Sequence, residues 1–259
     1  MIVDDIVAEL EKLVGDQQEN IVIYSALWPL LRMVNMPGQK LAADLCGCIM
    51  KKFAGRTLLM PTFTSGFDKE GVCDLDLLPS QTGALSENFR VCRGVQRTRS
   101  AFFSFAVYGP DAAKLISLKP KDAWGSGSLY EWLYNHDAAI LTLGLHPTHC
   151  SYTHYGEWLK RDKIPYRFNK IFSGTLICDQ VSMFATETLF VRQRDPEPIN
   201  DFTHLLPEYL ASGMQLSKPH EYPVSCISAK AKIDVVSTAI SKNKLALISN
   251  KEQFAHYGR

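Results

Sequence analysis

A short apolar strand, a helix and a second apolar strand follow one another early in the chain. Residues 21–24 read Ile-Val-Ile-Tyr, residues 39–53 carry a helical apolar pattern that ends near Gly55, and residues 58–60 read Leu-Leu-Met. Strands without polar alternation are typical of a sheet that is buried on both faces. A helix between two such strands is the connection that parallel strands require. This unit predicts an α/β fold whose central sheet is flanked by helices.

The alternation of helices and strands continues to residue 161. Ile2, Ile6, Leu10 and Leu13 recur at helical spacing, and Gly15 marks the end of that helix. We expect a loop over 61–80, helices at 85–89, after 109–110, after 125–128 and at 151–161, and strands at 102–106 and 139–143.

After Pro165 the pattern changes to β. Residues 171–177 and 183–191 predict antiparallel strands or a hairpin, and helices at 205–210 and 229–241 complete the chain. No internal repeat, low-complexity segment or clear linker divides the sequence. We therefore expect a single domain over residues 1–259, with a mixed central sheet.

Composition and charge limit the classes of partner. The 28 Lys and Arg residues nearly balance the 27 Asp and Glu residues, so a basic surface for nucleic acid is not expected. The longest apolar stretches are a few residues, too short for a membrane span, and the acidic start at 1–5 differs from a signal peptide. Seven cysteines without a Cys-x-x-Cys indicate reduced, mostly buried thiols. These features predict a cytoplasmic protein with no nucleic-acid or membrane partner.

Several common catalytic motifs do not occur in the sequence. These are the phosphate-binding Gly-x-x-x-x-Gly-Lys-Ser/Thr loop, a dinucleotide-binding Gly-x-Gly-x-x-Gly after a strand, and the Gly-x-Ser-x-Gly nucleophile elbow. The Gln/Arg-x-x-Gly-x-Gly/Ala loop of the commonest acetyltransferase fold is missing as well.

Residues 146–157 hold the densest cluster of reactive side chains, directly after the predicted strand 139–143. Loops at the carboxyl ends of strands bind ligands in α/β sheets. If a helix begins near Ser151, His154 and Glu157 share one of its faces because they are three residues apart. A carboxylate beside an imidazole fixes its tautomer and favours the protonated form, which suits a general base that works near neutral pH. Ser151 lies three residues before His154, so its hydroxyl could point at a developing oxyanion.

The residues alone leave other interpretations of this segment open. His154 and Glu157 could form a solvated pair on a helix surface. A metal site made of His146, His149 and His154 would have a spacing that matches no standard helix or finger pattern, so we expect no metal. Cys150 could act as a nucleophile, although only its position supports that role.

Seven short segments stand out when the sequence is taken in order. They are Ile-Tyr-Ser-Ala-Leu at 23–27, Met-Pro-Thr-Phe-Thr at 60–64, Thr-Gly-Ala-Leu-Ser-Glu-Asn-Phe-Arg at 82–90, Ser-Phe-Ala at 104–106 with Gly-Pro at 109–110, Trp-Gly-Ser-Gly-Ser at 124–128, His-Tyr-Gly-Glu at 154–157, and Pro-Tyr-Arg at 165–167. Together, from about residue 20 to 180, they resemble the aminoglycoside 3-N-acetyltransferase family. The segment at 154–157 matches the family's His-x-Ala-Glu. The resemblance implies a single acetyltransferase domain with that family's α/β fold, which differs from the commoner acetyltransferase fold.

The resemblance implies acetyl transfer from acetyl-CoA to the amino group of a small molecule, by direct attack within a ternary complex. It makes His154 the base that takes the proton from the amine, Glu157 the residue that orients this base, and Ser151 a contributor to the oxyanion site. The cosubstrate positions it implies are Ser25, Ala26, Leu27, Thr62, Ser104, Phe105 and Ser128. Taken without the resemblance, Ser25 also suits a strand end, Phe105 the core and Ser128 a helix N-cap.

The acceptor side departs from the family pattern. Members that inactivate antibiotics usually carry His-Pro-Thr-His before Ser-Phe-Ala, whereas residues 100–103 here read Ser-Ala-Phe-Phe. This difference favours an amino sugar of a surface-polysaccharide or natural-product pathway over an antibiotic. An acidic loop that includes Asp68 could instead receive a polycationic antibiotic. The candidate acceptor residues are Asp68, Glu87 and Phe103.

Two other classes of function stay open. A hydrolase could use His154 and Glu157, with or without a metal, to activate water. A relative without turnover could bind only CoA or a sugar. Either a monomer or a homodimer is compatible with the sequence.

Overall fold

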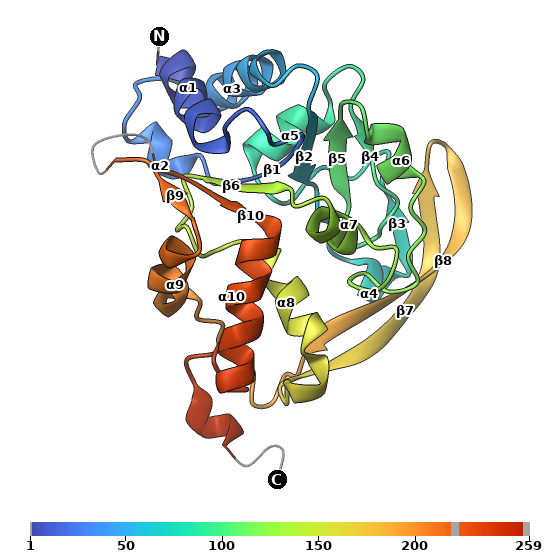
Figure 1. The fold of residues 1–259 in the computed structure, drawn as a ribbon. Helices are drawn as coiled ribbons and strands as arrows, with labels where there is room; N and C mark the ends of the chain where they lie inside the picture. Colours follow the sequence, from blue (N-terminus) through green and yellow to red (C-terminus); the bar gives the residue numbers. More distant parts are fainter. Residues whose placement is uncertain (1, 219–222, 256–259) are drawn as a thin grey trace.

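A seven-stranded mixed sheet forms the centre of the protein (Figure 1). The computed structural model describes residues 2–218 and 223–255. The three middle strands run parallel to one another. Each of the four outer strands runs antiparallel to its neighbour on the side of the sheet's centre. In order across the sheet, the strands are β4 (Gln96–Arg97), β5 (Phe105–Tyr108), β2 (Thr57–Pro61), β1 (Asn20–Ser25), β6 (Ala139–Leu143), β10 (Val224–Ser228) and β9 (Gln215–Leu216).

Side chains of the central strands supply a core on each face of this sheet. In β1, Ile21 and Ile23 belong to one apolar cluster, whereas Val22 and Tyr24 belong to the other. Successive side chains of a strand point to opposite faces, so a strand that is apolar throughout needs cover on both. The structure thus confirms the predicted α/β class, with a mixed sheet flanked by helices.

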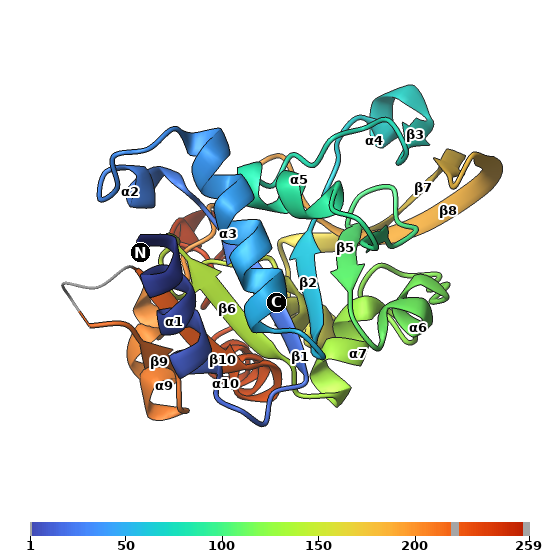
Figure 2. The ribbon, with the colours of Figure 1, turned by 90° about the horizontal axis from the view of Figure 1, so that it is seen from above.

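The helices divide between the two faces of the sheet (Figure 2). One face is covered by α1 (Ile2–Val14), α2 (Trp28–Leu31), α3 (Gly38–Lys52) and α5 (Ala84–Arg90). The other face is covered by α6 (Ala112–Ile116), α7 (Leu129–Asn135), α8 (Thr153–Leu159), α9 (Leu206–Ala211) and α10 (Ala229–Lys242), with 3₁₀ turns at Arg161–Lys163, Thr203–Leu205 and Lys251–Phe254.

A second sheet of three strands extends to one side of the first (Figure 1). β7 (Arg167–Cys178) and β8 (Val181–Arg192) form a long hairpin, which confirms the hairpin predicted after Pro165. The third strand, β3 (Val72–Asp74), pairs in parallel with β7 and follows the single turn α4 (Phe67–Glu70).

The predicted secondary structure differs from the structure at several short elements, and α2, β4 and β9 are among those it lacks. The predicted loop 61–80 contains α4 and β3, which are too short to produce a periodic signal. The strand expected at 102–106 begins at Phe105, because residues 101–103 bend and the Phe103 amide donates to Ser100 Oγ at 3.0 Å. β10 is absent from the sequence prediction, since Val-Ser-Cys-Ile-Ser is neither a continuous apolar run nor a strict alternation of apolar and polar residues.

All seven cysteines carry free thiols, and five of them are buried. Within the described residues, none of the helices combines the length and the apolarity that crossing a bilayer demands.

Candidate active site

His154 and Glu157 lie on α8, which the chain reaches soon after β6. Because β6 pairs in parallel with β1, the segment after it leaves the sheet at the carboxyl edge of the parallel strands. Gly144 has a φ of 72°, and a Cβ at this position would lie 2.0 Å from the carbonyl oxygen of Ala26. The absence of a side chain therefore lets the segments after β1 and β6 touch beside the site.

Glu157 is completely buried and lies against two hydrogen-bonding groups and one guanidinium. His154 Nδ1 and Arg167 Nε lie 2.5 Å and 3.0 Å from its Oε2, and the Tyr166 hydroxyl donates to its Oε1 at 3.0 Å. Burial alone would raise the pKa of this carboxyl, but Arg167 and His154 outweigh burial and lower the pKa to about 2. Glu157 is therefore a carboxylate at neutral pH, and His154 donates to it through Nδ1.

Because Nδ1 of His154 contacts Glu157, the other ring nitrogen, Nε2, is the one that can accept a proton from a substrate. Its side chain is 24% exposed. Burial and the positive charge of Arg167 lower the pKa of His154, although Glu157 acts in the opposite direction. The carboxylate therefore favours the protonated ring, as expected, but burial and Arg167 outweigh its effect on the pKa of His154. The surroundings instead favour the neutral ring, which is the form that a general base requires.

A cleft of about 410 Å³ opens beside His154. Several separate parts of the chain form its walls, and most of the wall side chains are apolar or aromatic. The lining residues are Tyr24, Ser25, Pro61, Phe63, Thr82, Leu145, His149, Cys150, Ser151, His154 and Phe202. Among the described residues, no Asp, Glu, Lys or Arg lines this cleft. The cleft therefore suits a ligand with an uncharged, partly apolar chain.

Comparison with known families decides the class of this protein. A model of the aminoglycoside 3-N-acetyltransferase family matches residues 42–240. The chain belongs to the aminoglycoside 3-N-acetyltransferase family. It is an acyltransferase, and acetyl-CoA is the cosubstrate of this family, which confirms the resemblance found in the sequence.

Solved structures of aminoglycoside acetyltransferases share the fold. AAC-IIIb in a binary complex with CoASH is 18% identical, with 93% of this chain and 97% of that chain covered and a TM-score of 0.70. Sisomicin-bound AAC-VIa is 19% identical, with 93% and 98% covered and a TM-score of 0.72. A histidine-to-alanine mutant of AAC(3)-IVa in complex with a gentamicin is 18% identical, with 98% and 92% covered and a TM-score of 0.67. A comparison with curated proteins finds no match.

Of the cosubstrate positions predicted for this acetyltransferase, Ser25 is the one that lines the cleft. Its hydroxyl is buried and has no hydrogen-bond partner within the described chain. Ala26 and Leu27 follow it at the end of β1; the Ala26 amide donates to the Leu143 carbonyl at 2.9 Å, and Leu27 is buried in the core.

The remaining cosubstrate positions of the acetyltransferase lie inside the protein. The Ser104 hydroxyl lies 3.2 Å from that of Thr62 and accepts from Arg97 Nε at 3.0 Å. Phe105 is completely buried in the core, and Ser128 Oγ accepts from the Glu131 amide at the start of α7. These residues shape the sheet and helices around the cleft rather than its surface.

The three predicted acceptor residues of the acetyltransferase are not brought together. Asp68 is exposed on α4, and Glu87 forms an ion pair with Arg90 at 2.6 Å. The hydrogen bond and positive charge of Arg90 lower the pKa of Glu87. Phe103 packs against Phe63, with ring centroids 5.1 Å apart, and so lies directly behind a residue of the cleft wall.

Ser151 Oγ lines the cleft and lies 3.3 Å from the hydroxyl of Tyr24. Tyr24, Phe202, Tyr166 and Arg167 receive no role from the sequence alone. The segment Pro-Tyr-Arg is part of the family pattern, but nothing in it indicates that both side chains reach Glu157. Phe202 gives no signal, because it precedes a short 3₁₀ turn far from His154 in the sequence.

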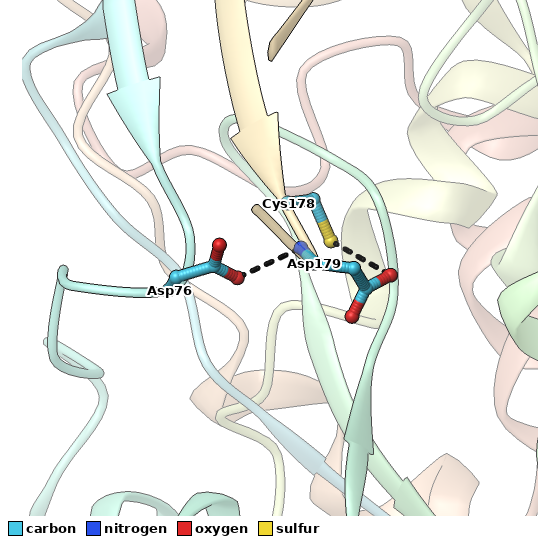
Figure 3. A group of neighbouring side chains, drawn as sticks. All are labelled: Asp76, Cys178 and Asp179. Carbon is cyan, nitrogen blue, oxygen red and sulfur yellow. Dashed lines mark hydrogen bonds between the residues drawn. The ribbon is translucent and has the colours of Figure 1, made fainter. Parts of the chain in front are cut away.

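The acetyltransferase has one group of potential metal ligands among its described residues: Asp76, Cys178 and Asp179. Figure 3 shows the carboxylate of Asp76 directed at the turn between β7 and β8. It accepts hydrogen bonds from the amides of Asp179 and Gln180 at 2.9 and 2.8 Å. Both turn residues have positive φ angles, 54° and 60°. Asp76 thus caps a tight hairpin turn, and His146, His149 and His154 form no comparable group within the described chain.

Proposed function

We propose that this acetyltransferase moves an acetyl group from acetyl-CoA directly to an amino group of an amino sugar or aminoglycoside, with His154 as the general base. The observation that carries the proposal is the arrangement of His154. Its Nδ1 is held 2.5 Å from a buried carboxylate, while the ring borders an uncharged cleft. A neutral imidazole with a fixed tautomer is suited to remove a proton from an amine.

In the transfer, a C–N bond to the acceptor replaces the C–S bond of the thioester, and one proton moves from the amine to the CoA sulfur through His154. The acceptor nitrogen attacks the thioester carbon as its proton passes to His154 Nε2, and Glu157 stabilises the imidazolium that forms. The tetrahedral intermediate collapses with cleavage of the C–S bond, and the proton from the imidazolium neutralises the CoA thiolate. The Ser151 hydroxyl, on the wall of the cleft, can donate to the developing oxyanion.

The cleft is the proposed site of the pantetheine arm of acetyl-CoA. That arm consists of alkyl segments and amides, which match apolar walls with a few hydroxyl groups. The unpartnered hydroxyl of Ser25 is available to one of those amides. A related structure that contains CoASH supports the choice of ligand.

The proposal includes both amino sugars and aminoglycosides as acceptors. Related structures contain the aminoglycosides sisomicin and gentamicin. The Ser-Ala-Phe-Phe segment instead makes the environment near the cleft apolar, since Phe103 packs on Phe63 and Trp124 with ring centroids 5.1 and 5.0 Å apart. An amino sugar carries fewer positive charges and requires fewer carboxylates in its site.

Thiol release from acetyl-CoA tests the proposal with a panel of aminoglycosides and nucleotide-linked amino sugars. We expect His154→Ala to lose about 10²–10⁴-fold in kcat and His204→Ala, an exposed control, to keep wild-type activity. Full activity of the His154 variant would overturn the assignment of the base. Binding of CoA without turnover of any acceptor would favour a non-catalytic relative, and water as the only acyl acceptor would favour a hydrolase.

A further inference from the structure

We propose that Arg167 is a positioning residue that holds Glu157 beside the imidazole and keeps His154 in its unprotonated form. The inference rests on the proposed function, because it explains how a histidine that adjoins a carboxylate remains available as a base. The motif in the sequence gives Arg167 no role of this kind.

The guanidinium of Arg167 contacts both members of the pair. Its Nε lies 3.0 Å from Glu157 Oε2, the same oxygen that faces His154 Nδ1, and its Nη2 lies 3.3 Å from that Nδ1. The side chain is 8% exposed. Nη1 donates to the Phe190 carbonyl at 3.4 Å, and Nη2 reaches Asn200 Oδ1 at 3.5 Å. Arg167 is thus anchored to β8 and to a later loop while it contacts the pair.

Arg167 is the cation that directly contacts His154 and Glu157. The other titratable and charged groups that face His154 are Glu157 on its own helix, Tyr166 just before β7, Arg192 at the end of β8, and His149 and Cys150 across the cleft. Arg192 is paired with Glu197 at 3.2 Å, so its charge is partly offset, whereas the charge of Arg167 is set directly against that of Glu157. The neighbouring rings of Trp124 and Phe202, with centroids 6.3 and 5.7 Å from that of His154, add no charge.

This balance has a direct chemical consequence. A carboxylate at 2.5 Å would by itself stabilise the imidazolium, and the ring would then be protonated at the pH where it must accept a proton. Arg167 neutralises that carboxylate and repels a second positive charge on the ring. The pKa of His154 is accordingly lowered, with burial as the largest cause and Arg167 as the next.

The test compares Arg167→Met and Arg167→Lys with Arg161→Met, an exposed control that also removes one guanidinium. We would follow the imidazole signals of His154 by NMR against pH and measure the pH profile of kcat/KM. We expect Arg167→Met to raise the pH of the His154 titration by about one to two units and to move the acid limb of the profile by the same amount. Arg167→Lys retains the charge and should stay near wild type, as should Arg161→Met.

An unchanged His154 titration in a folded Arg167→Met protein would overturn the inference. If that variant does not fold, Arg167→Gln provides the second test, because it removes the charge and keeps a polar side chain at this buried position. It should shift the titration upward as well, and no shift in a folded Arg167→Gln protein would overturn the inference. The NMR readout does not depend on catalysis. A shifted titration together with a fully active His154→Ala enzyme would therefore refute the proposed base and leave the role of Arg167 intact.

Discussion

Ser128 lies at the start of α7, where its hydroxyl accepts a hydrogen bond from the Glu131 amide at 3.1 Å. The same residue belongs to a segment that resembles a cosubstrate-binding motif, so two roles compete for one hydroxyl. Ser128 is 1% exposed, which favours the N-cap role.

Replacing Ser128 by alanine separates these two roles. We expect Ser128→Ala to lower the free energy of unfolding by about 1 kcal/mol and to leave the KM for acetyl-CoA unchanged. Urea titration measures the first quantity and thiol release the second. A several-fold rise in KM with unchanged stability would instead assign the hydroxyl to the cosubstrate. Ser126→Ala, in the exposed part of the same turn, is the matched control.

Some residues of the site can be predicted from the sequence, and others cannot. The spacing of His154 and Glu157 is sufficient to pair them, because both lie on one helix. Tyr166 and Arg167 complete the surroundings of Glu157 from outside α8, and no local pattern encodes that approach. The buried positions of Thr62, Ser104 and Phe105 are equally hidden from the sequence, since a hydroxyl or ring in a motif can face either a ligand or the core.

The contact between α8 and α10 depends on the absence of a side chain at Gly156. A Cβ there would lie 2.4 Å from Cγ1 of Val236. The two helices therefore approach each other closely at this position. α8 carries His154 and Glu157, the proposed catalytic pair, so we expect its packing to affect activity as well as stability.

Filling this contact should be destabilising. We expect Gly156→Ala to reduce the free energy of unfolding by about 1–3 kcal/mol, and Gly156→Ala with Val236→Ala to recover part of that loss. Urea denaturation of the two variants and of Val236→Ala alone completes a double-mutant cycle. Strict additivity of the two substitutions would show that the residues do not clash. Gly47→Ala in α3, where a Cβ meets nothing within 4 Å, is the control.

The hairpin of β7 and β8 depends on a residue from outside it. Asp76 accepts from both central amides of the turn, whose positive φ angles are unfavourable for Asp179 and Gln180. We expect Asp76→Ala to destabilise the protein by about 1 kcal/mol, with Asp68→Ala, exposed on α4, as the control. Thermal unfolding measures both, and equal melting temperatures would contradict the role of Asp76 as a cap.

Elements with a strong apolar pattern are predictable, and short ones are not. The strand at 139–143 and the helix at 2–14 agree with β6 and α1 because burial dictates most of their residues. β3 and β10 are specified by their partners, β7 and β6, rather than by their own sequences. The expectation of a single domain over residues 1–259 stays a prediction.

The stability of the whole molecule should fall in acid. The pKa of Glu157 drops from an ordinary 4.5 to about 2 on folding, so its contribution is present above pH 4.5 and is lost between 4.5 and 2. The pKa of His154 is also lowered from 6.5, so the unfolded chain binds that proton first as the pH falls below 6.5. Both effects have the same sign.

Urea unfolding at several pH values between about 7.5 and 3 measures this dependence. We expect the free energy of unfolding of the wild type to decline throughout the range, and that of Glu157→Gln to decline less steeply below pH 4.5. Glu208→Gln, which removes an exposed carboxyl, should follow the wild-type curve. Parallel curves for Glu157→Gln and the wild type would show that Glu157 keeps its ordinary affinity for protons.

The walls of the cleft come from segments between Tyr24 and Phe202, and β6, the strand that leads to the segment of His154, is paired with β10. During synthesis on the ribosome, the last of these parts emerges only after the chain has been made beyond β10. A nascent chain can therefore fold its first β-α-β unit early, but it assembles no partial active site on the way. Acetyl transfer is then a property of the finished protein, and we expect chains that stall before β10 to contribute none of it.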